Sequence, residues 1–512
     1  MSNNNVITKM KPFTYKPPKL SIDVKKLKSN PSDIGFDRSK FITKIPLVCV
    51  AFPNPQNIGI FCKKFKSDIL HVERLQHIVK LAKPSPTPAG TGNDIKNKKV
   101  QLSKGILLKD EITSIDQVTP DNIAPNAYKF LIDNDASITG YDYICDYDFW
   151  KTDEILSSII PVGYCSRESL PSSFTATGHI AHVNLRDEFK PYSRIIGQII
   201  IDKNQPKIKM VVNKLDSINS KFRTFDMEIL SCIGDGSSDS NVFEVQHRES
   251  DCLFTFDFSK VYWNSRLHTE HDRLISKFKP GQVVGDVFAG VGPFSVPAGK
   301  KKVFVLSNDL NPFSYKYMCL NIKDNKVGSY VRPYNMDGGE FIKKSISLLN
   351  EWYMSTGNKN GEILITKGGG KYKDETTGKV LYKDEIVKLP RFYHHYVMNL
   401  PDTAINFLGN FVGLYNDHQD LVNGSDGNTT NFQLPCIHVH CFEKFSPEET
   451  HSITMEELHH RMHQRILKIM GTTEDVLLFN KMEFHLVRKV APTKPMFCVS
   501  FELPMELAIT TI

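Results

Sequence analysis

Short apolar runs and amphipathic stretches alternate along the C-terminal half of the chain, after Gly281. The apolar runs have the length of β-strands, and the stretches between them have the spacing of helices that bury one face. This alternation predicts a parallel sheet covered by helices. The runs are Val283–Ala289, Lys302–Asp309, Tyr330–Asn335, Tyr396–Leu400 and Cys436–Phe442.

Two further apolar runs, Glu483–Val490 and Pro495–Leu503, are close enough in the sequence to pair as a hairpin at the sheet edge. Seven strands ending in a hairpin match the methyltransferase variant of the doubly wound fold better than a dehydrogenase. The polar segment Asn358–Glu385 interrupts the alternation, and we interpret it as a surface insertion.

The N-terminal part of the chain has a different pattern. Residues 1 to about 125 are rich in Lys, Pro, Asn and Ser, and Lys83–Lys99 has the composition of a disordered linker. From about Asn126, runs such as Gly178–Leu185 and Ile195–Asp202 contain many β-branched residues and predict a compact α+β module.

Composition adds few constraints. A chain of 512 residues predicts two or three domains, and 40% hydrophobic with 24% charged residues excludes a mostly disordered or fibrous protein. The net charge of +7 favours a polyanionic partner without requiring one. The 10 cysteines form no CxxC pair and no run of about 18 apolar residues occurs, so we expect reduced thiols inside the cell and no membrane span.

A glycine-containing turn, GDVFAGVGPFS from Gly285 to Ser295, follows the first apolar run. Gly290 and Gly292 allow a tight turn and a close approach of the backbone to a ligand, and Pro293 suits the first turn of a helix. Such loops also occur in ordinary turns, so the surrounding residues decide between the two interpretations.

Carboxylates follow the next two runs. In this fold, Asp309 is placed to accept hydrogen bonds from a ribose diol, and Asp337 to accept from an adenine amino group; the alternative is that both are simple loop or cap residues. We therefore expect an adenosine-containing ligand. Phe294 stands where a pyrophosphate would approach, which favours S-adenosylmethionine. Asn399–Pro401 resembles the polar-Pro signature by which amino and base methyltransferases hold a planar nitrogen.

Several motifs together resemble one family, the archaeal and eukaryotic tRNA guanine-N1 methyltransferases that modify guanosine 37, immediately 3′ of the anticodon. The resemblance covers roughly residues 126 to 505. It implies an α/β, Rossmann-like class I methyltransferase domain, with S-adenosyl-L-methionine as cofactor and tRNA as partner, preceded by smaller α+β tRNA-recognition domains. The motifs are VVNKL (Val211–Leu215), QHRE (Gln246–Glu249), VYWNSRLHTEHDRL (Val261–Leu274), DVFAGVGPFS, NDLNP (Asn308–Pro312) and MNLP (Met398–Pro401).

The pattern and the resemblance together predict four parts. They are an N-terminal extension, partly disordered and with a linker (1–125), an N-terminal tRNA-recognition domain (126–190), a middle α+β domain (191–260) and the methyltransferase domain (261–512, with the insertion at about 358–385).

The resemblance implies that Glu270, Arg223 and Asn399 carry the catalysis, and the chemistry asks for these residue types. Guanine N1 carries a proton and is a poor nucleophile, so a general base such as Glu270 must remove it. Charge then develops on O6, where the Arg223 guanidinium would stabilise it, while Asn399 would orient the base edge. On spacing alone, Glu270 is a solvated carboxylate in a first helical turn, and Arg223 is a surface ion-pair partner.

The resemblance also implies the binding residues. The target base would contact Tyr262, Asn399 and Pro401. The cofactor would contact His271, Asp286, Phe288, Gly290, Gly292, Asp309, Leu310, Asp337, Gly338, Asn399 and Pro401.

No metal site is expected. His459 and His463 are four residues apart on a helical stretch, and His438 and His440 share a strand face, but no Glu completes an HExxH motif. Two alternative functions stay open: the related aminocarboxypropyl transferase of wybutosine synthesis, and a non-catalytic RNA-binding module on the same fold. We expect a monomer without an obligate protein partner, acting in the cytoplasm, nucleus and mitochondrial matrix.

Overall fold

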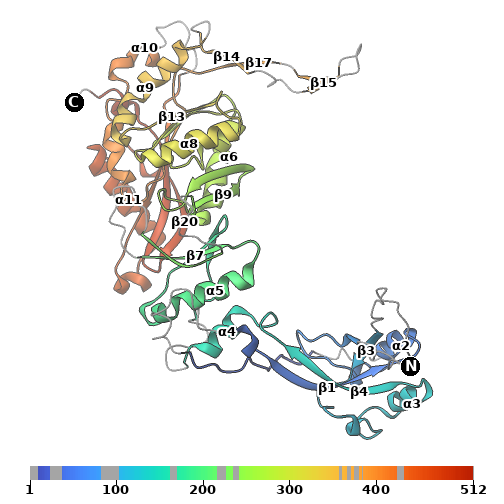
Figure 1. The fold of residues 1–512 in the computed structure, drawn as a ribbon. Coiled ribbons are helices and arrows are strands. Elements are labelled where there is room, and N and C mark those ends of the chain that lie inside the picture. The colour runs from blue at the N-terminus through green and yellow to red at the C-terminus, as the bar shows by residue number, and fades with distance from the viewer. Residues whose placement is uncertain are drawn as a thin grey trace, which may run out of the picture. The chain divides into compact units, whose positions relative to one another are not determined.

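The computed structural model divides into two compact units (Figure 1). Unit 1 comprises Met1–Ser173 and Leu185–Gln205, and unit 2 comprises Phe174–Asn184 and Pro206–Ile512. The structure describes residues 10–22, 37–81, 103–161, 170–215, 226–233, 241–356, 360–365, 371–373, 380–382, 384–423 and 432–510. The predicted linker Lys83–Lys99 lies outside these residues. Among the helices in these ranges, none has the length and apolar character needed to cross a membrane.

Unit 1 is built on a four-stranded antiparallel sheet in the order β2-β3-β1-β4. Strand β1 pairs with β4 over nine positions, from Thr43↔Cys145 to Ala51↔Ser137. Strands β1 to β3 fall within the range 1–125 and β4 falls after it, so the compact unit crosses the boundary predicted at residue 125. The elements are β1 (Thr43–Ala51), α2 (Gln56–Lys64), β2 (Ile78–Leu81), β3 (Ser103–Leu107), α3 (Pro125–Asp133), β4 (Ser137–Cys145), α4 (Thr152–Ile159) and α5 (Ser193–Asn204).

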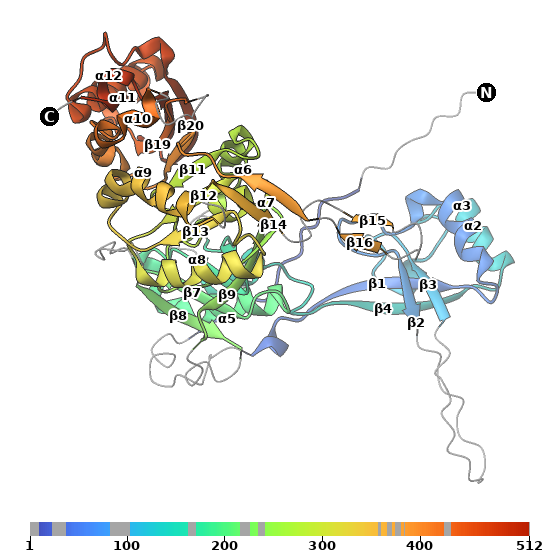
Figure 2. The same ribbon diagram turned by 90° about the horizontal axis from the view of Figure 1, so that it is seen from above.

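Unit 2 begins with two small sheets. The first has the order β5-β6-β7-β8 and the second is the ribbon of β9 and β10. Helix α8 (Pro312–Asp324) lies close to this ribbon (Figure 2). It is fastened there by side chains, because Asn321 Oδ1 accepts a hydrogen bond from the Thr255 amide (2.8 Å) and Asn325 bonds both backbone groups of Leu253. The strands are β5 (Thr175–Thr177), β6 (Ile180–Val183), β7 (Met210–Lys214), β8 (Met227–Cys232), β9 (Glu244–Glu249) and β10 (Cys252–Asp257).

The main sheet of unit 2 has seven strands in the order β13-β12-β11-β18-β19-β21-β20. The first five are parallel, and β21 runs antiparallel to both β19 and β20. This confirms the predicted seven-stranded sheet with its C-terminal hairpin. The strands are β11 (Val283–Asp286), β12 (Phe304–Asn308), β13 (Val331–Tyr334), β18 (His395–Met398), β19 (Cys436–Phe442), β20 (Glu483–Ala491) and β21 (Lys494–Glu502).

Strands β11 and β12 are buried along their whole length. Parallel strands covered on both faces need apolar residues at every position, which explains why these runs show no alternation. Helix α8 starts where expected, because Asn311 caps it and Pro312 occupies its first turn. The larger helices of unit 2 are α6 (His268–Lys277), α7 (Ser295–Lys300), α8 (Pro312–Asp324), α9 (Gly338–Met354) and α11 (Met455–Met470).

The predicted insertion Asn358–Glu385 contains strands of its own. Strand β14 (Glu362–Ile365) pairs with β17 (Glu385–Lys388), and β15 (Lys371–Lys373) pairs with β16 (Val380–Tyr382). Both ladders are antiparallel and neither joins the seven-stranded sheet. The insertion therefore extends as ribbons between α9 and β18 and leaves the order of the main strands unchanged.

Candidate active site

The predicted site residues gather at one edge of the main sheet. Because β11, β12, β13 and β18 are parallel, the residues that follow them emerge at the same edge. The glycine loop follows β11, Asp309 follows β12, Asp337 follows β13 and Asn399 follows β18. The ordered series predicted from the sequence is therefore a spatial cluster.

The glycine loop needs both of its glycines. Gly290 and Gly292 have φ angles of +59° and +96°, in the region that favours glycine. A Cβ atom on Gly292 would lie 2.9 Å from Val296 Cγ2, whereas one on Gly290 would meet nothing within 4 Å. Gly292 thus permits tight packing against α7, while Gly290 faces open space that a ligand can occupy.

Asp309 ties strand β12 to this loop. Its Oδ2 accepts a hydrogen bond from the Gly290 amide and its Oδ1 from the Asn311 amide, both at 2.8 Å. Burial raises the pKa of Asp309, and the two backbone hydrogen bonds oppose that rise. A carboxylate has about four acceptor positions, so capacity remains for hydroxyl donors.

The start of α9 combines a capping carboxylate with a neighbouring aromatic ring. Asp337 Oδ1 accepts from the amides of Gly339 (2.8 Å) and Glu340 (3.3 Å) and so caps α9. A Cβ on Gly338 would lie 2.6 Å from Phe288 Cε1, so glycine lets the ring pack closely against the helix start. Phe288 therefore lies beside Gly338 and the neighbouring Asp337, three residues that the resemblance assigns to the cofactor. The side chain of Leu310, beyond β12, is exposed.

Asp286 is the most deeply buried acidic group of the site. It is 0% exposed, and its Oδ2 accepts a hydrogen bond from Ser295 Oγ at 2.6 Å. Its Oδ1 has no hydrogen-bond partner within the residues that the structure describes. Burial raises the pKa of Asp286 to about 7. An unpaired buried acceptor of this kind fits a ligand that brings a hydrogen-bond donor.

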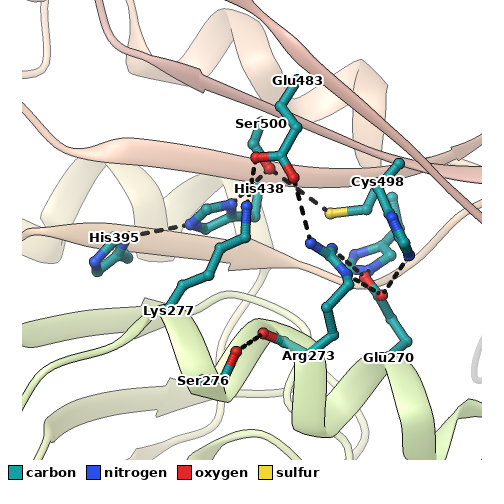
Figure 3. A network of polar contacts seen from close by, with 11 residues as sticks. Glu270, Arg273, Ser276, Lys277, His395, His438, Glu483, Cys498 and Ser500 are labelled. Carbon is teal, nitrogen blue, oxygen red and sulfur yellow. Dashed lines mark hydrogen bonds and ion pairs between the residues drawn. The ribbon is translucent and has the colours of Figure 1, made fainter.

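Glu270 lies in α6 and is only 2% exposed, which rules out the solvated first-turn carboxylate (Figure 3). Arg273 donates to both of its oxygens, from Nε at 2.6 Å and from Nη2 at 2.8 Å, and His440 Nε2 lies 2.8 Å from Oε1. Burial acts to raise the pKa of Glu270, but these hydrogen bonds outweigh it and hold the pKa well below its ordinary value.

His440 links Glu270 to the predicted base pocket. It follows the pair Met398↔Val439 by one residue in the parallel register, and so lies level with Asn399. Burial acts to lower the pKa of His440, but contacts with Cys498 and Glu270 raise it to about 10. In the sequence, the His438-His440 alternation was the only signal for this residue, and it suggested a metal ligand rather than a partner of Glu270.

The segment after β18 offers a free acceptor. Asn399 Oδ1 is buried and has no hydrogen-bond partner in the described part of the chain. The Pro401 carbonyl accepts from the Phe442 amide at 3.0 Å, which fixes the segment to the end of β19. Asn399 is thus held in place by its backbone, with its amide oxygen left to bind a donor.

Two other predicted residues lie on the stretch between β10 and the end of α6. His271 Nδ1 lies 2.5 Å from Glu249 Oε1, and its ring packs edge-on against Phe294 beyond the glycine loop. Tyr262 is 45% exposed, so part of its ring is accessible to a ligand. Sequence reasoning assigned no role to Glu249, although it belongs to the QHRE motif. Arg223 lies outside the described residues.

The histidines considered as metal ligands have other partners. His463 Nε2 lies 2.8 Å from the Leu477 carbonyl, and His459 stacks on Phe484. His438 and His395 lie 3.1 Å apart, with Cys436 close enough to form a potential ligand group. Their outer nitrogens contact Ser500 Oγ and Gln282 Oε1. This continuous hydrogen-bond chain satisfies both rings without a metal.

Two family models and several known proteins match this chain. Residues 152–236 match the family model described as the TYW2 N-terminal domain, and residues 245–356 match that of the TRM5/TYW2 methyltransferase domain. The tRNA (guanine(37)-N(1))-methyltransferase of Saccharomyces cerevisiae is 48% identical over 486 residues, covering 92% of this chain and 93% of that protein. The protein of the same name from Schizosaccharomyces pombe is 39% identical over 479 residues, covering 94% and 96%.

A solved structure supports the fold. The wild-type Trm5b of Pyrococcus abyssi superposes with a TM-score of 0.50 at 20% identity, covering 90% of this chain and 99% of that one. At this identity the likeness concerns the arrangement of the elements.

Proposed function

The chain belongs to the tRNA (guanine(37)-N1)-methyltransferase family, and from this membership we propose that it methylates N1 of guanosine 37 in tRNA, with S-adenosyl-L-methionine as methyl donor. The observation that carries the proposal is the position of Glu270. Its buried carboxylate contacts His440, and His440 is level with Asn399 in the sheet register. Asn399 lies at the same edge of the sheet as the glycine loop. Glu270, the proposed general base, and Asn399, the amide proposed to bind the target nucleobase, thus lie next to a site that can accept an adenosine ligand.

The residues present fit the cofactor. The open space at Gly290 admits the ligand, Asp309 retains acceptor capacity for ribose hydroxyls, and the unpaired Asp286 Oδ1 would accept from the amino group of the methionine part. Asp337 and Phe288 would border the adenine. Bound S-adenosyl-L-methionine supplies an electrophilic methyl group, and the protein must supply a nucleophile at guanine N1.

Guanine N1 becomes nucleophilic when its proton leaves. Glu270 Oε1 already accepts from Arg273 and His440, whereas Oε2 accepts one hydrogen bond, from Arg273 Nε. Oε2 therefore has the free lone pair, and we assign it as the atom that takes the N1 proton. The electron pair of the broken N–H bond stays on N1, ready to form the new bond to carbon.

Asn399 suits guanine in particular. Its unpaired Oδ1 is a hydrogen-bond acceptor and needs a donor from the ligand. The Watson–Crick edge of guanine carries donors at N1 and at the exocyclic amino group. Adenine presents an unprotonated N1 at the same position, which would leave Oδ1 unpaired. Tyr262 would stack under the base once it leaves the anticodon loop. The stabilisation of O6 by Arg223 stays a prediction from the resemblance.

The test is a nucleoside analysis after reaction of the purified chain with labelled S-adenosyl-L-methionine and a tRNA transcript that carries guanosine 37. We expect 1-methylguanosine with this transcript and no labelled nucleoside with an adenosine-37 transcript. Glu270→Gln should lose turnover while cofactor binding persists. A 3-amino-3-carboxypropyl product would instead identify the transferase of wybutosine synthesis, and an unlabelled tRNA would identify a non-catalytic RNA-binding module.

We also propose a monomer that acts in the cytoplasm, nucleus and mitochondrial matrix, supported by the family resemblance alone. Light scattering coupled to gel filtration and imaging of a fluorescent fusion test the two points, and a dimer or confinement to one compartment would contradict them.

A further inference from the structure

The surroundings of Glu270 conflict with its role as a base. Both of its oxygens are bound by Arg273, and a second cation, His440, lies 2.8 Å from Oε1. Two cations stabilise the carboxylate against protonation, so in this arrangement Glu270 is a weak proton acceptor. Each unit by which its pKa falls makes proton uptake from guanine tenfold less favourable. One of these partners must therefore withdraw for the base to act.

Arg273 is the partner that has a second carboxylate within reach. Its Nη1 lies 3.6 Å from Glu483 Oε1, and its side chain is 20% exposed. Glu483 begins the edge strand β20 and is half-exposed, so its carboxylate can follow the guanidinium (Figure 3). Lys277, one turn further along α6, also contacts Glu483 and holds it above the helix.

Two of the other groups around Glu270 are deeply buried. His440 comes from the buried interior of β19 and is 0% exposed, and Cys498, on β21, is equally buried. His485, on β20, lies 3.6 Å from Oε2, beyond hydrogen-bond distance, and burial lowers its pKa, which disfavours its charged form. Among the charged groups that face Glu270 from α6, β19, β20 and β21, Arg273 combines partial exposure with a second acceptor.

We infer that Arg273 is a positioning residue that exchanges carboxylates: on Glu270 it orients the base and keeps it weak, and its transfer to Glu483 releases Oε2 to take the N1 proton. This inference rests on the role proposed above for Glu270. In the released state the N1–H bond breaks toward Oε2, and His440 still holds Oε1 in position. Glu483 thereby contributes to methyl transfer from outside the site.

The experiment measures single-turnover methyl transfer by the full chain at pH 4 to 9, a range that includes the ordinary pKa of a glutamate, with a guanosine-37 transcript. Glu483→Gln removes the second acceptor and leaves Arg273 on Glu270, so the rate should fall about three- to tenfold while half-saturation by tRNA and by cofactor stays unchanged. Arg273→Gln should act in the opposite sense on the base, moving the acidic limb of the pH–rate profile to higher pH. Arg273→Lys keeps the charge without the two-pronged contact and should restore the original limb.

The matched control is Glu449→Gln, which removes another partly exposed carboxylate paired with an arginine, Arg461, in the same unit. It should leave the rate unchanged. If Glu483→Gln behaves like this control, or Arg273→Gln leaves the acidic limb in place, the exchange is refuted. If Glu270→Gln itself retains methyl transfer, the proposed role of Glu270 fails first, and the two failures are distinguishable.

Discussion

Replacing Asp286 by asparagine should stabilise the folded chain, and more so as the pH rises. Burial raises the pKa of Asp286 to about 7 in the folded state, against about 3.9 for an unfolded aspartate. Between these values the folded chain binds a proton that the unfolded chain has lost, so folding becomes less favourable with increasing pH. About three pKa units at about 1.4 kcal/mol each give a cost of about 4 kcal/mol above pH 7.

The assay follows unit 2 alone, because a chain with two compact units need not unfold in one step. Hydrogen exchange of peptides that contain β11, measured for both proteins in urea without ligand, gives the difference in unfolding free energy. The difference should be about 1 kcal/mol at pH 4.5 and rise to about 4 kcal/mol at pH 8, while the exposed control Asp324→Asn shows no such trend. A gap between wild type and Asp286→Asn that is equal at both pH values would refute the reasoning.

Three further predictions concern ligand binding and turnover. Gly290→Ala forces a side chain into the left-handed region at a cost of about 1 kcal/mol and fills the open space, so calorimetry should show weaker cofactor binding with the fold retained. Asn399→Ala removes the free acceptor and should slow single-turnover methyl transfer about 100-fold, and discrimination against adenosine 37 should fall with it. Tyr262→Ala should raise half-saturation by tRNA, whereas Tyr262→Phe keeps the stacking ring and should resemble the wild type; equal effects of the two would rule out stacking.

The parts of the fold that the sequence predicted are those written in local patterns. The fully apolar β11 and β12, the Asn311-Pro312 helix start and the positions of Asp309 and Asp337 all follow from residues near one another in the chain. The seven strands and the C-terminal hairpin could be predicted because each strand is a short apolar run in the sequence, whereas their order in the sheet was not predicted. Asp337 also shows that the two interpretations weighed for it are compatible, since it caps α9 and still borders the site.

The remaining features depend on contacts between distant residues, which no local pattern records. The pairing of β1 with β4 joins segments about 90 residues apart, so the Lys- and Pro-rich composition concealed a folded sheet. The burial of Glu270 depends on His440, which lies 170 residues further along. Spacing alone therefore indicated a solvated carboxylate, where the folded chain builds a buried cluster of charges.

The attachment of the β9–β10 ribbon to α8 determines where an expressed fragment of this enzyme can begin. A fragment that starts at Val261, the boundary predicted from the sequence, would lack the ribbon and leave Asn321 and Asn325 facing water instead of Thr255 and Leu253. It would also lack Glu249, the hydrogen-bond partner of His271, and it would lack Phe254 and Phe256, which belong to the apolar core. The smallest fragment worth expressing therefore begins upstream of Glu244, and a shorter one should be recovered as aggregate.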